Sequence, residues 1–125
     1  MTTLLALYRR PDGGPAAQET FERRYLTEYL PLVAPTPGLR ATRVQRVVTA
    51  LGGETDLILA TSMDFDDRAS LDAGLASDAM RAAGRNPREI APGLGTLLVL
   101  EDAPEIVAGT SLPVDTVVDT SEGST

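Results

Sequence analysis

Two tyrosines, Tyr25 and Tyr29, are the residues of this sequence best placed to contact a small molecule. They stand four positions apart in a segment whose apolar residues recur at helical spacing, so both rings should point from one helix face toward the core. Lining a pocket, the two phenols would offer hydrogen bonds to a small, mostly apolar ligand. The alternative is that both are core aromatic residues whose hydroxyls bond to a backbone partner.

Arg24 and Asp64 complete the set of candidate pocket residues. Arg24 directly precedes Tyr25, and its spacing from Glu28 also suits an ion pair on a helix surface. Asp64 stands near the end of a predicted strand, on the face with fewer apolar residues. In an apolar pocket its carboxylate would act as a general base, and the alternative is a capping or solvated role. The pattern identifies no catalytic residue.

Four side-chain types are missing from the chain, namely Cys, His, Trp and Lys, and all 11 basic residues are Arg. Without Cys there is no disulfide, thiolate nucleophile or thiolate-bound metal. Without His there is no Ser-His-Asp triad and no imidazole ligand, and without Lys there is no Schiff base. Carboxylates, Tyr, Ser, Thr and Arg remain, and no set of them has metal-ligand spacing. We therefore predict neither a metal nor a cofactor.

The chain has 125 residues, a formal charge of −7 and a pI near 4.4. A negative field of this kind repels phosphate backbones and anionic lipids, so we expect no nucleic-acid and no membrane partner. No stretch approaches the roughly 20 apolar residues of a membrane span, and Met1 leads into a strand without a signal-peptide pattern. These features favour a cytoplasmic protein.

The acidic charge is concentrated at the C-terminal end. Residues 101–125 contain six acids and no base, whereas residues 1–100 contain twelve acids and eleven Arg and are almost neutral. We therefore divide the chain into a domain over residues 1–101 and an acidic C-terminal arm over residues 102–125. Within the arm, residues 113–119 alternate apolar and acidic positions like an edge strand. The arm would dock on its own or on a partner subunit, or be an extended end held only by lattice packing.

Turn-forming residues divide the domain into six elements. The pattern predicts strands over 3–8, 39–48, 56–65 and 96–100, a helix over 16–33, and a helix starting at Asp66 or Asp67 and running to Ala76. A further helical turn begins at Ser77 and reaches Ala83, where Gly84 to Pro87 should end it. The order strand, helix, strand, strand, helix, strand predicts an α+β, ferredoxin-like antiparallel sheet.

The first and last strands are apolar on both faces. Two helices cover only one face of a four-stranded sheet, and its other face normally alternates toward polar residues. A second subunit that applies its own sheet would cover that face. The sequence therefore predicts a homodimer with the two sheets face to face.

The segment from Phe21 to Leu32, followed by Pro37-Gly38-Leu39-Arg40, resembles the ethyl tert-butyl ether degradation (EthD) family. The Leu-Leu-Ala-Leu-Tyr strand at residues 4–8, the Phe-Asp-Asp entry to the second helix at residues 65–67 and the closing strand at residues 96–99 extend the resemblance over about residues 3–101. The resemblance implies a dimeric α/β barrel.

The first helix of that family usually carries a His-Tyr pair and a second His two residues before Pro-Leu. At those positions this chain has Arg24-Tyr25 and Tyr29, so both family histidines are absent. The resemblance implies binding of a small apolar or aromatic metabolite in oxidative catabolism, as an enzyme or as a monooxygenase accessory. A catalytic member would be similar to cofactor-independent oxidoreductases or to isomerases and dehydratases. The missing histidines favour the alternative, a non-catalytic ligand-binding or structural dimer.

Overall fold

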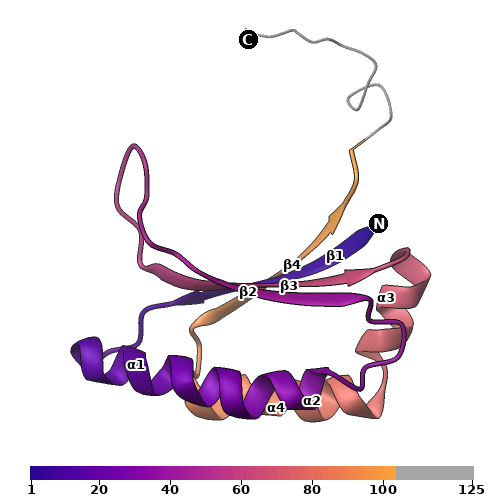
Figure 1. The fold of residues 1–125 in the computed structure, drawn as a ribbon, viewed down its shortest axis with the longest axis horizontal. Coiled ribbons are helices and arrows are strands. Elements are labelled where there is room, and N and C mark those ends of the chain that lie inside the picture. Colours follow the sequence, from indigo (N-terminus) through magenta and orange to yellow (C-terminus); the bar gives the residue numbers. More distant parts are fainter. Residues whose placement is uncertain (104–125) are drawn as a thin grey trace, which may run out of the picture.

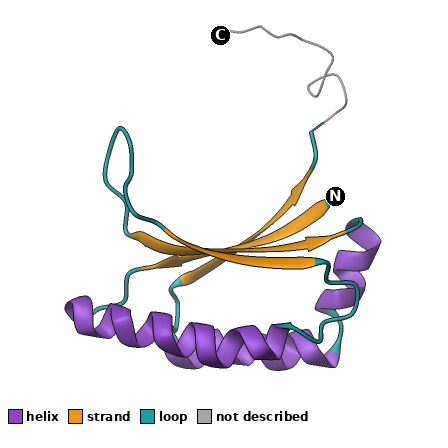
Figure 2. Ribbon diagram, in the orientation of Figure 1, coloured by secondary structure: helices purple, strands orange, loops and turns teal. Residues whose placement is uncertain are grey.

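A computed structural model of the chain describes residues 1–103 and shows two layers, a sheet and the helices on one side of it (Figures 1 and 2). Strands β1 (Thr2–Arg9), β2 (Ala41–Arg46), β3 (Leu57–Phe65) and β4 (Gly95–Glu101) form an antiparallel sheet in the order β2-β3-β1-β4. This is the predicted α+β, ferredoxin-like arrangement. None of the helices within residues 1–103 is long and apolar enough to cross a membrane.

The first helical segment is continuous but changes its winding in the middle. It consists of α1 (Gly14–Arg24), a π-helical turn η1 (Tyr25–Tyr29) and α2 (Leu30–Val33), and so matches the predicted helix with a start two residues earlier. In the π turn the Leu30 N–H donates to the carbonyl of Tyr25, five residues back. The turn lies just before Pro31, which has no N–H to donate and whose ring needs room at the preceding turn.

The second helical segment has two parts, α3 (Arg68–Leu75) and α4 (Asp78–Ile90). Asp67 caps α3, since its carboxylate accepts from the Ser70 N–H at 2.8 Å. The prediction that the second part ends at residues 84–87 is wrong, because α4 continues through Pro87. Packing against η1 and α2 outweighs the local breakers, and Asn86 Nδ2 donates to Glu28 Oε1 of η1 at 2.9 Å.

The core lies between the sheet and the two helical segments. Leu4, Ala6 and Tyr8 of β1 point toward the helices, and alternate residues of β3 lie beside them. The helices contribute aromatic and aliphatic side chains. The buried residues of this cluster are Leu4, Ala6, Tyr8, Phe21, Tyr25, Tyr29, Val33, Ile58, Leu59, Met63, Phe65, Leu71, Met80, Ala83 and Ala91.

The opposite face of the sheet carries apolar side chains that no helix within residues 1–103 covers. Leu98 and Leu100 of β4 are 40% and 44% exposed, and Leu5 lies directly beside Leu98 in the β1–β4 register. The helices of the described part of the chain lie on the other side of the sheet (Figure 1). The predicted acidic arm, with its expected strand over residues 113–119, lies outside the described residues apart from positions 102 and 103.

Two helix glycines should respond in opposite ways to alanine. A Cβ on Gly74 would lie 2.8 Å from Cε2 of the buried Phe65, whereas a Cβ on Gly84 would meet nothing closer than Arg88 Nη2 at 4.0 Å. We expect Gly74→Ala to lower the free energy of unfolding by about 1–3 kcal/mol through overpacking. Gly84→Ala should raise it by up to about 1 kcal/mol, because alanine favours the helix. Urea denaturation followed by circular dichroism measures both, and effects of the same sign would contradict this packing.

Candidate functional site

All three tyrosines of the chain meet between the first helical segment and the sheet. Tyr8 comes from the end of β1, and Tyr25 and Tyr29 come from the two ends of the π turn. The Tyr25 and Tyr29 rings are stacked, with centroids 4.7 Å apart and planes at 21°. The Tyr8 ring meets Tyr25 edge-on at 5.0 Å. These contacts hold three phenols in fixed orientations, each less than 5% exposed.

The three hydroxyls stand in different surroundings. The Tyr25 hydroxyl bonds to Thr61 Oγ1 of β3 at 2.6 Å, and both residues are fully buried. Burial raises the pKa of Tyr25 and of Tyr29 far above the ordinary value of 10.0, and proximity to Tyr8 raises both further. Burial also raises the pKa of Tyr8, an effect that the nearby Tyr25 hydroxyl partly offsets. All three phenols are therefore neutral hydrogen-bond donors at physiological pH.

A cavity of about 250 Å³ opens beside Tyr8 and Tyr29, bounded by α4, by the turn that follows it and by β4. Its volume lies just below the roughly 300–1,000 Å³ typical of drug-sized ligand sites, so it suits a smaller molecule. The residues that line it are Tyr8, Tyr29, Gly84, Pro87, Arg88, Ala91, Gly93, Gly95 and Leu97.

Glycine shapes this cavity. A Cβ on Gly95 would lie 2.9 Å from Cε1 of Tyr8, so only glycine at this point of β4 leaves room for the Tyr8 ring. On α4, Gly84 presents no side chain to the cavity that it lines. The space beside the tyrosines therefore depends on two residues with no side chain of their own.

Among the predicted pocket residues, the two tyrosines lie together but have different roles in the packing. Tyr29 lines the cavity, whereas Tyr25 lies behind it in the core with its hydroxyl bonded to a side chain. The burial of Tyr25 agrees with the alternative that this residue is a core aromatic side chain. Its partner is the threonine side chain of β3 rather than a backbone group.

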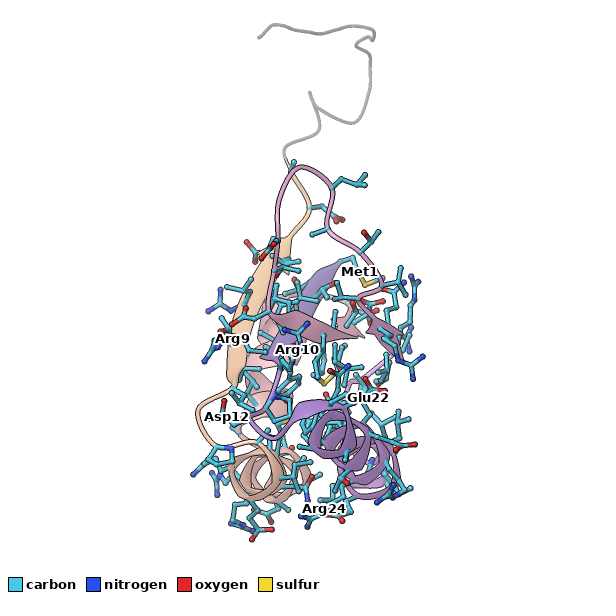
Figure 3. All side chains as sticks on the ribbon, turned by 90° about the vertical axis from the view of Figure 1, so that its left-hand side faces the viewer. Met1, Arg9, Arg10, Asp12, Glu22 and Arg24 are labelled. Atoms are coloured by element: carbon cyan, nitrogen blue, oxygen red, sulfur yellow. The ribbon has the colours of Figure 1, made fainter. Side chains whose placement is uncertain are left out.

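The structure does not bring Arg24 or Asp64 to the tyrosines. Arg24 lies on the side of the helix away from the sheet (Figure 3), where Nε donates to Glu28 Oε2 at 2.8 Å. That hydrogen bond, together with one from Asn86, lowers the pKa of Glu28. Asp64 lies on the opposite face of the sheet, where it accepts from Thr3 Oγ1 at 2.7 Å.

Tyr8 and Arg88 line the cavity but were not among the predicted candidates. Tyr8 carried a usable signal, since it is one of only three tyrosines and continues the inward-facing alternation of Leu4 and Ala6. Arg88 lies beyond the point where the sequence predicted the helix to end. Its place beside the cavity follows from the continuation of α4 through Pro87.

The polar side chains that line the cavity are all hydrogen-bond donors, because neutral phenols can donate and a guanidinium has no acceptor. No carboxylate is among the lining residues in the described part of the chain. Residues 1–103 also contain no group of three or more acidic, Cys or His side chains that could hold a metal ion. The arrangement suits binding or polarisation of an oxygen that accepts hydrogen bonds.

No protein-family model matches the chain, and a search of curated proteins finds no match either. Solved structures do resemble it. An EthD family protein from Bacillus halodurans is 32% identical, with a TM-score of 0.74 over 82% of this chain and 99% of that one.

Two less similar structures show the fold alone. A dimeric protein of unknown function with a ferredoxin-like fold from Bacteroides fragilis is 18% identical, with a TM-score of 0.61 over 81% of this chain and 95% of that one. A variant of SnoaB, a cofactor-independent oxygenase from Streptomyces nogalater, is 15% identical, with a TM-score of 0.56 over 82% of this chain and 93% of that one.

Proposed function

The chain belongs to the EthD family, and from that premise we propose that it binds a small apolar or aromatic molecule in the cavity beside Tyr8 and Tyr29. In this proposal it serves the oxidative breakdown of such molecules, as an enzyme or as a monooxygenase accessory. The observation that carries the proposal is a cavity of about 250 Å³ lined by two of the three tyrosines, Tyr8 and Tyr29, with the third, Tyr25, packed against both of their rings. Tyr8 and Tyr29 provide an aromatic wall with polar groups, and Tyr25, stacked on Tyr29 and edge-on to Tyr8, holds both rings in place from the core.

The chemistry available to such a site follows from its protonation. Because burial keeps the phenols protonated, the Tyr29 hydroxyl can donate to a carbonyl or to an oxygen on which negative charge develops. A hydrogen bond to the developing oxyanion is what a cofactor-independent oxygenase, an isomerase or a dehydratase needs when its substrate passes through an enolate. The oxygenase similar in fold supports this reading only by analogy.

One observation favours a second function, a binding protein without catalysis. The described cavity lining has three donors but no carboxylate and no imidazole that could remove a proton. In this second proposal the protein would hold the molecule for another enzyme.

We also propose that the protein is a homodimer whose sheets pack face to face. The exposed Leu98 and Leu100, together with Leu5 beside them, form an apolar face on the sheet that none of the described helices covers. Several structures of similar fold are described as dimeric, which supports the same arrangement.

Native mass spectrometry of the purified protein should identify a bound molecule, and Gly84→Leu should abolish its binding by filling the cavity.

If the protein is an enzyme, Tyr29→Phe should lower its turnover of that molecule by about 100-fold, the effect of losing one donor to a developing oxyanion. If it is only a binder, the same change should weaken affinity by less than about tenfold.

Tyr25→Phe is the matched control, because its hydroxyl is bonded to Thr61 and does not line the cavity. It should lower stability and leave binding and turnover nearly unchanged. Loss of ligand in Tyr25→Phe with none in Gly84→Leu would place the binding site elsewhere.

A further inference from the structure

Arg88 brings positive charge to the cavity. It stands on α4 one turn after Gly84, and its guanidinium Nη2 would lie 4.0 Å from a Cβ on that glycine. Because Gly84 has no side chain, the Arg88 head group can lie against the helix where both residues line the cavity. The guanidinium is therefore available to a molecule in the cavity.

The charge of Arg88 is not neutralised by a neighbour in the described part of the chain. Several arginines there have a carboxylate within 4.0 Å, namely Arg24, Arg40, Arg46, Arg68 and Arg81. Within residues 1–103, no carboxylate lies that close to Arg88. Arg88 is itself exposed, and a carboxylate gives its unpaired guanidinium charge-assisted, bidentate hydrogen bonds that a neutral group cannot give.

The other polar side chains of the cavity also suit an anionic group that accepts hydrogen bonds. Tyr8 and Tyr29 line it, and among the described lining residues no side chain carries negative charge. Such a site offers several donors to a group with acceptor oxygens, whereas only the phenol oxygens can accept from a group that must donate. The planar fork of Arg matches the two oxygens of a carboxylate.

We propose that the molecule taken by this cavity is a small apolar or aromatic carboxylic acid, bound as its carboxylate by Arg88 with the phenols of Tyr8 and Tyr29 beside it. This inference rests on the proposed function, because it names the chemical class of the molecule bound at the same site. The apolar part of the acid would lie against the tyrosine rings and Leu97.

Cyclohexanecarboxylate and its neutral amide are the probes, because they share one apolar skeleton and do not obscure tyrosine emission. Tyr8 and Tyr29 line the cavity, Tyr25 packs against both, and the chain has no Trp, so its intrinsic emission reports on this region. The carboxylate should bind the full-length protein at least about tenfold more tightly than the amide, and Arg88→Gln should remove that preference. Arg85→Gln, an exposed arginine of the same helix that does not line the cavity, should preserve it.

The outcomes separate this inference from the proposed function. Equal binding of acid and amide, or equal losses in Arg88→Gln and Arg85→Gln, would overturn the carboxylate assignment. If Gly84→Leu still abolished amide binding in that case, the proposed function would stand. Binding of neither probe would also overturn the assignment, and the mass-spectrometric search for a bound molecule would then decide the proposed function by itself.

Discussion

Raising the pH from 10 to 12 should lower the free energy of unfolding by roughly 5 kcal/mol, through Tyr25 and Tyr29 alone. Burial raises the pKa of both phenols far above 10.0 in the folded protein, while in the unfolded chain they ionise near that value. Their contribution is fully present below pH 10. Above pH 10 the unfolded state releases protons that the folded state keeps, so stability falls as pH rises. Tyr8, whose pKa is also raised, adds to the loss.

Urea unfolding at several pH values, followed by circular dichroism, measures this loss directly. Absorbance near 295 nm reports phenolate, and the native protein should show none until it unfolds. Tyr29→Phe should reduce the alkaline slope by about 1.4 kcal/mol per pH unit, since it removes one ionising group. Phenols that titrate near pH 10 while the circular dichroism remains native would contradict the buried cluster.

Leu98→Asp should convert the proposed dimer into a monomer. Leu98 stands beside Leu5 on the apolar face of the sheet, and a two-fold interface would bury two new carboxylates, one from each subunit. A buried, unpaired charge costs at least about 2 kcal/mol, so the dissociation constant should rise by roughly a thousandfold or more. Light scattering at micromolar concentration would then give the mass of one chain.

Leu26→Asp is the matched control, since Leu26 is 45% exposed on the helical segment rather than on the sheet. Light scattering should give this control variant the mass of two chains, as it should for the unmodified protein. A single-chain mass for the unmodified protein at the same concentration would refute the dimer.

The spacing of apolar residues predicted the helices and strands well, because the buried and exposed faces of an element alternate with a fixed period along the sequence. Phe21, Tyr25 and Tyr29 recur at helical spacing and are all buried, and the inward positions of β3 alternate as expected. The apolar residues on both faces of β4 predicted one face covered by helices and one uncovered face, whereas residues on both faces of β4 are exposed, with Leu97 on the helix side at 60%. Each of these features depends on residues that are close together in the sequence, so the pattern of residue types is enough to predict it.

The site was less predictable because it depends on contacts between distant segments. Gly84 and Pro87 are local helix breakers, and only the packing of α4 against the first helical segment, including the bond from Asn86 to Glu28, explains why the helix continues to Arg88. Likewise Tyr8 meets Tyr25 only because β1 lies in the middle of the sheet. Asp64 was correctly placed on the less apolar face of its strand, and that face lies away from the cavity.

The π turn at Tyr25–Tyr29 has a consequence for how this helix is aligned with those of its relatives. A π turn holds one residue more than the α-helical turn that it replaces. Deleting one residue there would rotate everything after it by about 100° relative to α1, so that the buried Val33 would leave the core. A relative whose helix is α-helical throughout therefore matches this chain only with a one-residue gap inside residues 25–29. Where that gap is placed decides which residue of the relative corresponds to Tyr29 at the cavity.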